Sequence, residues 1–329
     1  MNFFEKINAK HIPSVDLVKF IMAIFVVAIH TLQPFIATLP IVWSKILNFL
    51  IGLAVPFFFV TSGFLLCEKL KVKDYSEKLL YMRKWLKRTL RLYIIWTIIY
   101  LPYAMLGFYK DNLGLWKSVL VYIRNVVFVG ENYLSWPLWY LLAMIVAGLI
   151  YYLILLIKPK RFLLVLVTLA ILLWGIGIII DSNEMQFELY FSLFRRIENG
   201  FFKGFPFMTI GFIISIIGRC RMWLSSSLLF LGIILQSFEV NIGGLIITYA
   251  FFSMVLSLRI HLENEEICNM FRLSSVVIYF VHMLWIGILI ICFEISSLYL
   301  FIISLLLSLM TSYLVIRNKN EKVVKLLFK

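Results

Sequence analysis

The first long apolar run of the sequence, SVDLVKFIMAIFVVAIHTLQPF (residues 14–35), contains three ionisable side chains, Asp16, Lys19 and His30. Ionisable groups inside a membrane span are costly and usually mark a functional site. If the run is helical, Lys19 and His30 share one face, about 16 Å apart along the axis, with Asp16 within about 40° of it. Because an imidazole neutral near pH 7 can act as a general base, His30 is the first candidate for proton transfer.

Asp16 and Lys19 also have a simpler interpretation. Both lie in the first turns of the run, where charged side chains often extend to the lipid headgroups. An interfacial pair of this kind would be an anchor and would take no part in chemistry. The sequence leaves both interpretations open.

A second histidine, His282, falls near the middle of the later apolar run LSSVVIYFVHMLWIGILI. A buried histidine can be structural, bonded to a carbonyl of a neighbouring helix. Two imidazoles that converge on one cavity would instead be equipment for proton transfer. His282 is therefore a candidate for acceptor binding or for a proton relay, and the fold decides whether it meets His30.

A cluster of basic residues occurs in YMRKWLKRTLRLY (residues 81–93). Five cationic side chains fall within nine residues: Arg83, Lys84, Lys87, Arg88 and Arg91. On a helix, Arg88 and Arg91 would be i, i+3 neighbours. The cluster is typical of a cytoplasmic anchor that contacts anionic lipid. It would equally suit a phosphorylated donor, because guanidinium groups match phosphate oxygens.

Two further segments are unusual for membrane spans. AVPFFFVTSGFLL (residues 54–66) places Pro56, Ser62 and Gly63 inside an apolar run, which predicts a bend or a close helix approach. NYLSWPLWYLLAM (residues 132–144) gathers Trp139 and other aromatic residues at the start of a span. The aromatic residues of the second segment could belong to a functional site, or they could form an ordinary aromatic belt at the membrane interface.

The composition indicates what kind of scaffold holds these residues. Hydrophobic residues make up 63% of the 329 residues and charged residues 15%. A soluble domain is nearer half apolar and a quarter charged, so a soluble enzyme, a disordered chain and a fibrous repeat are excluded. The net charge of +14 suits cytoplasmic membrane loops better than nucleic acid. The four cysteines have neither metal-ligand nor disulfide spacing, and we expect no metal.

We predict an all-α polytopic bundle of about ten transmembrane helices, with both termini cytoplasmic. The predicted spans are 15–36, 46–66, 92–108, 137–157, 162–180, 201–217, 223–239, 242–258, 273–293 and 298–316. With ten spans, 23 of the 31 basic residues fall on the cytoplasmic side and 7 outside, as the positive-inside rule requires.

Segment 113–129 breaks this pattern if it crosses the membrane. It contains Lys117 and Arg124, and counting it as a span would reverse every later loop. We therefore predict an interfacial helix there. Glu239, Val240 and Asn241 predict a turn between two short spans. We further expect no cleaved signal peptide, no appended soluble domain, and a single domain over residues 1–329.

Taken together, these motifs resemble the acyltransferase family 3 of integral membrane acyltransferases, over residues 12–316. Lys19 and His30 match the family's Arg-x10-His. VPFFFVTSGFLL is similar to its second-span signature, and Arg88-Thr89-Leu90-Arg91 to its Arg-x-x-Arg. WPLWYL, FPFMTIGF (residues 205–212) and SSVVIYFVH (residues 274–282) are similar to its later segments. Lys19 departs from the commoner Arg, so the charge is retained but the bidentate fork is lost.

The resemblance implies transfer of an acyl group, usually acetyl, from cytoplasmic acyl-coenzyme A to a hydroxyl of a cell-envelope glycan or lipid-linked glycan. Under this hypothesis acetyl-CoA is the donor substrate and the protein lies in the inner or plasma membrane. The expected catalytic residues are His30, Lys19 and His282. The expected donor-phosphate residues are Arg83, Lys84, Lys87, Arg88 and Arg91. The expected supporting residues are Asp16, Ser62, Trp139 and Tyr279.

Two questions stay open from the sequence. Some family members have a fused extracellular domain, whereas we expect a stand-alone form here. Such a form would either complete the transfer alone or pass the acyl group to a separate protein outside the cytoplasm. Intramembrane Asp, Lys and His also suit a proton-coupled transporter or flippase of an anionic or lipid-linked substrate. An inverted repeat would favour such a carrier, and the sequence has none.

Overall fold

The computed structural model describes residues 4–5, 12–157, 161–258, 260, 265–319 and 321–328, and most of them are helical. In this part of the chain the two strands are β1 (Phe4–Glu5) and β2 (Arg219–Cys220), paired antiparallel with Phe4 opposite Cys220. Internal contacts divide the chain into two compact units, Met1–Glu68 with Ile210–Phe328 (unit 1) and Lys69–Thr209 (unit 2). Each unit is described by itself.

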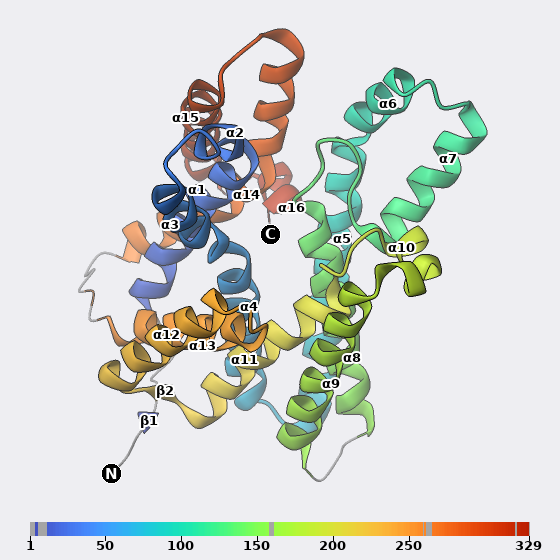
Figure 1. Ribbon diagram of the computed structural model, residues 1–329. Helices are drawn as coiled ribbons and strands as arrows, with labels where there is room; N and C mark the ends of the chain where they lie inside the picture. Colours follow the sequence, from blue (N-terminus) through green and yellow to red (C-terminus); the bar gives the residue numbers. More distant parts are fainter. Residues whose placement is uncertain are drawn as a thin grey trace. The chain divides into compact units, whose positions relative to one another are not determined.

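Unit 1 contains both ends of the described chain (Figure 1). Its helices are α1 (Pro13–Thr31), α2 (Gln33–Ile36), α3 (Ile41–Gly52), α4 (Ala54–Lys71), most of α11 (Phe205–Ile217), α12 (Met222–Ser237), α13 (Ile242–Ser257), α14 (Glu265–Cys292), α15 (Ser297–Arg317) and α16 (Lys322–Phe328). Helix α1 packs against α14 and α15, and α12 packs along α13. The long helices α1 and α14 therefore form the centre of this unit.

The close helix approach predicted at residues 54–66 is present. A Cβ atom on Gly211 of α11 would lie 2.1 Å from the carbonyl oxygen of Val60 and 2.5 Å from the backbone nitrogen of Phe64, both on α4. The two backbones touch there, so only glycine fits. The helix break falls at Leu53, between α3 and α4, and Pro56 is accommodated in the first turn of α4, where a proline removes no helix hydrogen bond.

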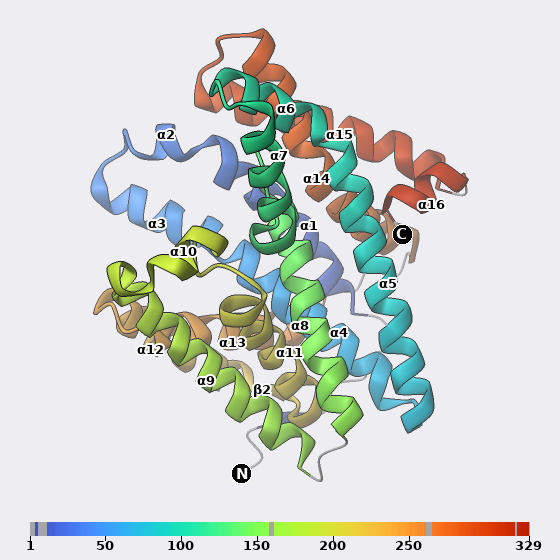
Figure 2. The same cartoon turned by 90° about the vertical axis from the view of Figure 1, so that its right-hand side faces the viewer.

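Unit 2 is built on α5 (Tyr75–Ile99), which packs along α8 (Leu138–Ile157) (Figure 2). Its other helices are α6 (Leu101–Lys110), α7 (Leu115–Arg124), η1 (Asn125–Val129), α9 (Phe162–Ser182), η2 (Glu184–Phe187), α10 (Glu188–Phe194), η3 (Gly200–Gly204) and the first residues of α11. Two of them, η1 and η3, are π-helical. Such segments are rare and occur frequently at functional sites.

The segment 67–91, which connects the predicted spans 46–66 and 92–108, is mostly helix. Helix α4 continues to Lys71 and α5 begins at Tyr75. The side chain of Asp74 caps α5 by accepting a hydrogen bond from the backbone N–H of Glu77 at 2.9 Å. A capped amphipathic helix is stable here because its basic face is solvated while its opposite face packs.

Seven helices in the described residues are long and apolar enough to cross a membrane, or eight if the bent pair α5 and α6 forms one span. Helices α12 and α13 are shorter, at 16 residues each, about 24 Å at 1.5 Å per residue. A multi-pass membrane protein follows from these helices. The count of ten spans and the cytoplasmic termini stay predictions. Six basic residues that entered the charge count lie outside the described residues: Lys6, Lys10, Lys158, Lys160, Arg259 and Lys329.

The relative direction of α1 and α14 bears on this count. Asp16 pairs with Arg272, and His30 stacks on His282, so the two helices run parallel. Parallel spans need an odd number of crossings between them. The long helices α4, α8, α9 and α11 give an even number, and adding the bent pair α5–α6 makes it odd. The parity therefore favours α5–α6 as a true span, with or without the α12–α13 pair.

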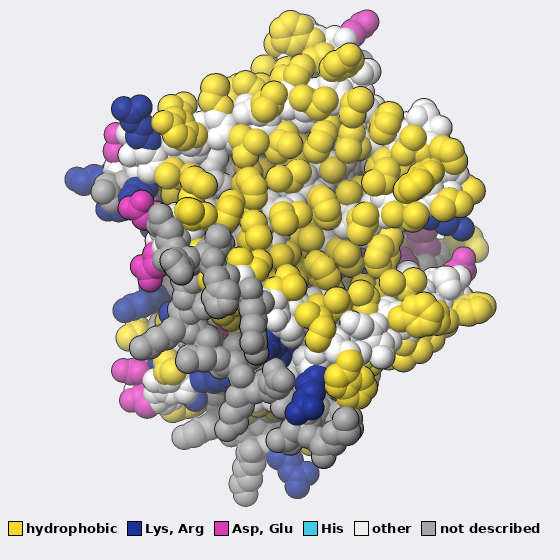
Figure 3. All heavy atoms as spheres, turned by 90° about the vertical axis from the view of Figure 1, so that its left-hand side faces the viewer, with side chains coloured by type: hydrophobic (Ala, Val, Ile, Leu, Met, Phe, Trp, Pro, Cys, Tyr) yellow, Lys and Arg dark blue, Asp and Glu magenta, His cyan; other side chains and the backbone are white. Residues whose placement is uncertain are grey.

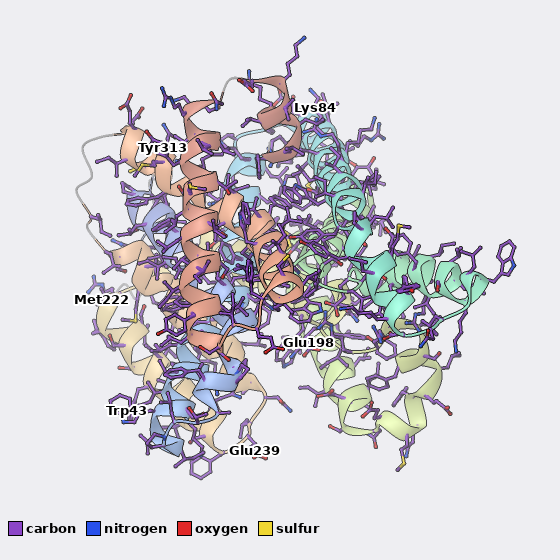
Figure 4. All side chains as sticks on the ribbon, turned by 90° about the horizontal axis from the view of Figure 1, so that it is seen from above. Trp43, Lys84, Glu198, Met222, Glu239 and Tyr313 are labelled. Carbon is purple, nitrogen blue, oxygen red and sulfur yellow. The ribbon has the colours of Figure 1, made fainter. Side chains whose placement is uncertain are left out.

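Apolar side chains cover much of the surface, as a lipid-facing protein requires. Figure 3 shows one face whose upper part is a nearly continuous field of hydrophobic side chains. Exposed apolar residues recur along α3 and α15, among them Trp43, which lies at the periphery of Figure 4. In water such a surface would aggregate, whereas in a bilayer it is the expected boundary with lipid.

Candidate functional site in the first unit

The two histidines singled out in the sequence come together. The rings of His30 on α1 and His282 on α14 are stacked, with centroids 5.5 Å apart and planes 24° apart. His30 is half-buried and His282 is completely buried. Two helices that are far apart in the chain thus place two imidazoles, which are able to transfer protons, side by side.

The hydrogen bonds of His282 define its tautomer. Its Nδ1 lies 2.9 Å from the carbonyl oxygen of Ile278, one turn earlier on α14. A carbonyl only accepts, so Nδ1 carries the proton and Nε2 is left with a lone pair in the neutral ring. Nε2 is buried and has no hydrogen-bond partner among the described residues. A buried acceptor without a partner is costly, which is the expected state of a group that meets a substrate proton.

About four turns from His30 on α1 and three turns from His282 on α14, the two helices are joined by an ion pair. Arg272 donates to both carboxylate oxygens of Asp16, from Nη2 at 2.7 Å and from Nε at 3.1 Å. Asp16 is buried, while 45% of the Arg272 side chain is exposed. Lys19 is half-buried and lies within electrostatic range of both groups. The bidentate pair holds the first turns of α1 against α14 and places the cation of Arg272 near Lys19.

The five basic residues predicted to bind donor phosphates lie together on α5. Arg83, Lys84, Lys87, Arg88 and Arg91 are all exposed, and Lys84 lies at the periphery in Figure 4. They occupy an arc of about 140° at 100° per residue. Further along the same arc the exposed residues become apolar at Ile94 and Ile98. That change from cationic to apolar is the pattern expected where a helix passes the headgroups of a membrane.

One of the five cations is already engaged within its own unit. Nε of Arg83 donates to the hydroxyl of Tyr152 on α8 at 2.6 Å, and the guanidinium lies 5.7 Å from that ring centroid. Arg83 therefore helps to hold α5 against α8. Lys84, Lys87 and Arg91 form no ion pair with the described residues, so their charges face outward.

The predicted supporting residues have different surroundings. Ser62 is half-buried on α4, and Tyr279 is half-buried on α14, edge-on to Phe280. Trp139, at the start of α8, lies under the guanidinium of Arg196, 5.4 Å from its ring centroid. The structure gathers Asp16, Lys19, His30, His282 and Tyr279 on the α1–α14 pair of unit 1. The basic cluster and Trp139 belong to unit 2.

Sequence reasoning missed two ion-paired arginines. Arg272 was counted only as a loop charge, although a buried Asp16 needs a counter-charge and so points to one. Arg196 pairs with Glu131 in unit 2. Burial raises the pKa of Glu131, and Arg196 opposes part of that rise. Within the described residues, no three His, Cys, Asp or Glu side chains form a metal-binding group.

A mostly helical bundle of apolar spans with a stacked histidine pair on two of its helices is a multi-pass membrane protein, and comparison with known families specifies its class. The family model described as "Acyltransferase domain" matches residues 12–317. The chain therefore belongs to this acyltransferase family, and the resemblance seen in the sequence is confirmed.

Two curated relatives, both named amino-acid racemase and both from Enterococcus faecalis, are also similar. One is 32% identical over 214 residues, covering 61% of this chain and 28% of the relative. The other is 29% identical over 136 residues, covering 41% of this chain and 18% of the relative. The chain thus spans less than a third of the length of either relative. No solved structure matches.

Proposed function

We propose that this membrane acyltransferase moves an acyl group, acetyl in the first instance, from cytoplasmic acetyl-CoA to a hydroxyl of a cell-envelope glycan or lipid-linked glycan. The observation that carries the proposal is the stacked pair of His30 and His282, with the bare Nε2 of His282 buried beside His30. Hydroxyl acylation needs a base at the acceptor and an acid at the leaving thiolate. An imidazole provides both in turn.

His30 is assigned the role of general base. It removes the proton from the acceptor hydroxyl as the oxygen attacks the thioester carbonyl of the donor. When the carbon–sulfur bond breaks, the imidazolium returns this proton to the departing thiolate, so the histidine is regenerated. His282 accepts a hydrogen bond at Nε2 from the acceptor or from His30 and so orients the reacting pair.

Arg88 and Arg91 are assigned to the donor phosphates, with Lys84 and Lys87 as additional charges. Guanidinium forks are suited to phosphate oxygens. Lys19 is assigned to donor positioning, and the Asp16–Arg272 pair keeps its surroundings charged and ordered. Arg83 has a smaller part than the other cations, because Tyr152 already occupies its Nε.

The inner or plasma membrane is the proposed location, since the donor is cytoplasmic and the acceptor belongs to the envelope. An acyl-acceptor protein outside the cytoplasm is a second form of acceptor. The name of the two relatives refers to amino acids, so an acceptor screen includes free amino acids beside glycans. The amine or hydroxyl of an amino acid would undergo the same transfer.

The test is incubation of the nanodisc-reconstituted protein with radiolabelled acetyl-CoA and envelope extract. His30→Ala should lower label transfer by about 10²–10⁴-fold, the usual contribution of a general base. His282→Asn is the more selective variant, because its amide can still donate to the Ile278 carbonyl but lacks the Nε2 acceptor. Full transfer by His30→Ala would exclude the assigned base. No turnover by the wild type would favour a transporter, which a substrate-flux assay would then detect.

A further inference from the structure

Unit 2 contains a cavity that the transfer reaction does not use. Its volume is about 240 Å³, larger than an engineered apolar cavity of about 150 Å³ that stays dry and binds benzene. The lining is apolar except for Asn199 and comes from η1, the first turns of α8, the end of α10 and η3, and includes Phe128, Trp139, Val146 and Phe194. A cavity with this lining selects an apolar molecule.

The cavity opens at the surface of its unit. Three lining residues, Val127, Phe128 and Phe201, are 54%, 37% and 38% exposed. Helix α8 is a candidate membrane span, and an exposed apolar rim beside such a span suits contact with the lipid phase. Trp139 and Val146 are seven residues apart on α8, about 10 Å along its axis. The cavity therefore extends from near the membrane boundary into the hydrocarbon layer.

Three guanidinium groups gather at the boundary end. Arg196 lies over Trp139 and pairs with Glu131, and its Nε is buried without a hydrogen-bond partner among the described residues. Arg195 follows the lining residue Phe194 and is exposed. Arg124 donates from Nη1 to the carbonyl oxygen of Ser192 at 3.1 Å. Burial, followed by the charge of Arg195, lowers the pKa of Arg124, as neighbouring cations do.

The backbone holds these cations in place. Arg195 adopts a left-handed conformation with φ of 64° at the end of α10. This backbone conformation favours glycine, and adopting it costs an arginine about 1 kcal/mol relative to glycine. Arg196 is tied down through its own carbonyl oxygen, which accepts a hydrogen bond from the Tyr190 hydroxyl at 3.1 Å. Glu131 and Glu198 lie nearby, so three guanidinium groups are set against two carboxyl groups.

We propose that this cavity binds one hydrocarbon chain of an anionic membrane lipid whose phosphate contacts Arg195 and Arg196. The apolar lining fits the chain, the exposed rim opens to lipid, and the cations lie at the level of the headgroup. Lipid binding at this site needs no acyl donor, so the site is independent of the transfer reaction. A lipid-linked acceptor of that reaction would be a lipid of the same chemical class.

Photo-crosslinking tests the proposal in the full chain. The probe is phosphatidylglycerol with a diazirine in its acyl chain, diluted into phosphatidylcholine nanodiscs, and the comparison probe is phosphatidylcholine with the same diazirine chain. Mass spectrometry should place the label in residues 125–129 and 194–204. The anionic probe should label these segments up to about fivefold more strongly, the preference that one partly exposed ion pair provides.

Matched variants separate the chain pocket from the charge. Arg195→Gln should remove the preference for the anionic probe, whereas Arg161→Gln, an exposed arginine before α9, should leave it unchanged. Ala143→Leu, which fills the cavity, should remove labelling by both probes. Val127→Trp narrows the exposed rim with little risk to folding and should also reduce labelling.

Three results would overturn the proposal. Equal labelling by both probes, unchanged in Arg195→Gln, would identify ordinary boundary lipid. Unaltered labelling in both Ala143→Leu and Val127→Trp would place the chain elsewhere. No label in either segment would leave another apolar molecule, such as the acceptor, as the occupant. Each readout is made without acetyl-CoA, so loss of transferase activity would not affect it.

Discussion

Arg272 donates to both carboxylate oxygens of Asp16, at 2.7 and 3.1 Å, across 256 residues of sequence. This bidentate pair joins α14 to α1 at one level, and the stacked rings of His30 and His282 join the same helices at another. The spacing is 14 residues on α1 and 10 on α14, about 21 and 15 Å. Two contacts at different levels fix the register of a parallel helix pair, which one contact would leave free to slide.

The ion pair can be weighed by a double-mutant cycle. Asp16→Asn should lower the free energy of unfolding by about 1–2 kcal/mol, because Arg272 loses a charged partner but stays partly solvated. Thermal unfolding in one detergent would be measured for Asp16→Asn, Arg272→Gln and the double variant. The double variant should lose less than the sum of the two single changes. Additive losses would mean that the two side chains do not interact.

The contact of α11 with α4 predicts a severe effect from one methyl group. Gly211→Ala would place a Cβ atom 2.1 Å from the Val60 carbonyl oxygen, so we expect a loss of about 1–3 kcal/mol from forced separation of the helices. Gly175→Ala on α9 is the control, since nothing lies within 4 Å of its Cβ position. That change should be neutral or stabilise by up to about 1 kcal/mol. Equal melting temperatures of the two variants would contradict the close approach.

The raised pKa of Glu131 predicts a pH dependence of stability. Burial raises this pKa more than Arg196 lowers it, so the folded protein retains a proton that the unfolded chain releases. The contribution to stability is therefore fully present below the ordinary carboxyl pKa and is lost as pH rises through the raised folded pKa. Glu131→Gln should remove this slope. Unfolding curves of both proteins between pH 4 and 7 would be compared, and parallel pH profiles would be the contrary outcome.

Helix α7 should lie in the membrane interface, as its sequence predicts. None of its residues is buried, and its exposed apolar residues include Leu115, Trp116 and Leu120. Spin labels on Leu120→Cys and on Ser118→Cys, which lies off the apolar face, would report depth through accessibility to oxygen and to a polar nickel complex. Leu120→Cys should be at the level of the upper acyl chains and Ser118→Cys in the headgroups. Both labels near the bilayer centre would make α7 a span.

The long apolar runs of the sequence determined the positions of most helices. Each predicted span lies within or overlaps an observed helix, and the turn predicted at Glu239 separates α12 from α13. The basic residues from Arg83 to Arg91 placed this stretch outside the predicted spans. In the structure it is part of α5, whose other face packs on α8. Helix boundaries shifted because amphipathic ends continue beyond the apolar run.

Tertiary structure alone decided which polar residues meet. The spacing of Lys19 and His30 follows from the pitch of one helix, and so the sequence contains it. The pairing of Asp16 with Arg272 and of His30 with His282 depends on which faces of α1 and α14 pack together, and this is set by side chains along both helices at once. The cavity beside Trp139 likewise needs four separate segments to converge. A pattern within one segment cannot encode such contacts, whose energies arise only when distant segments exclude lipid and water together.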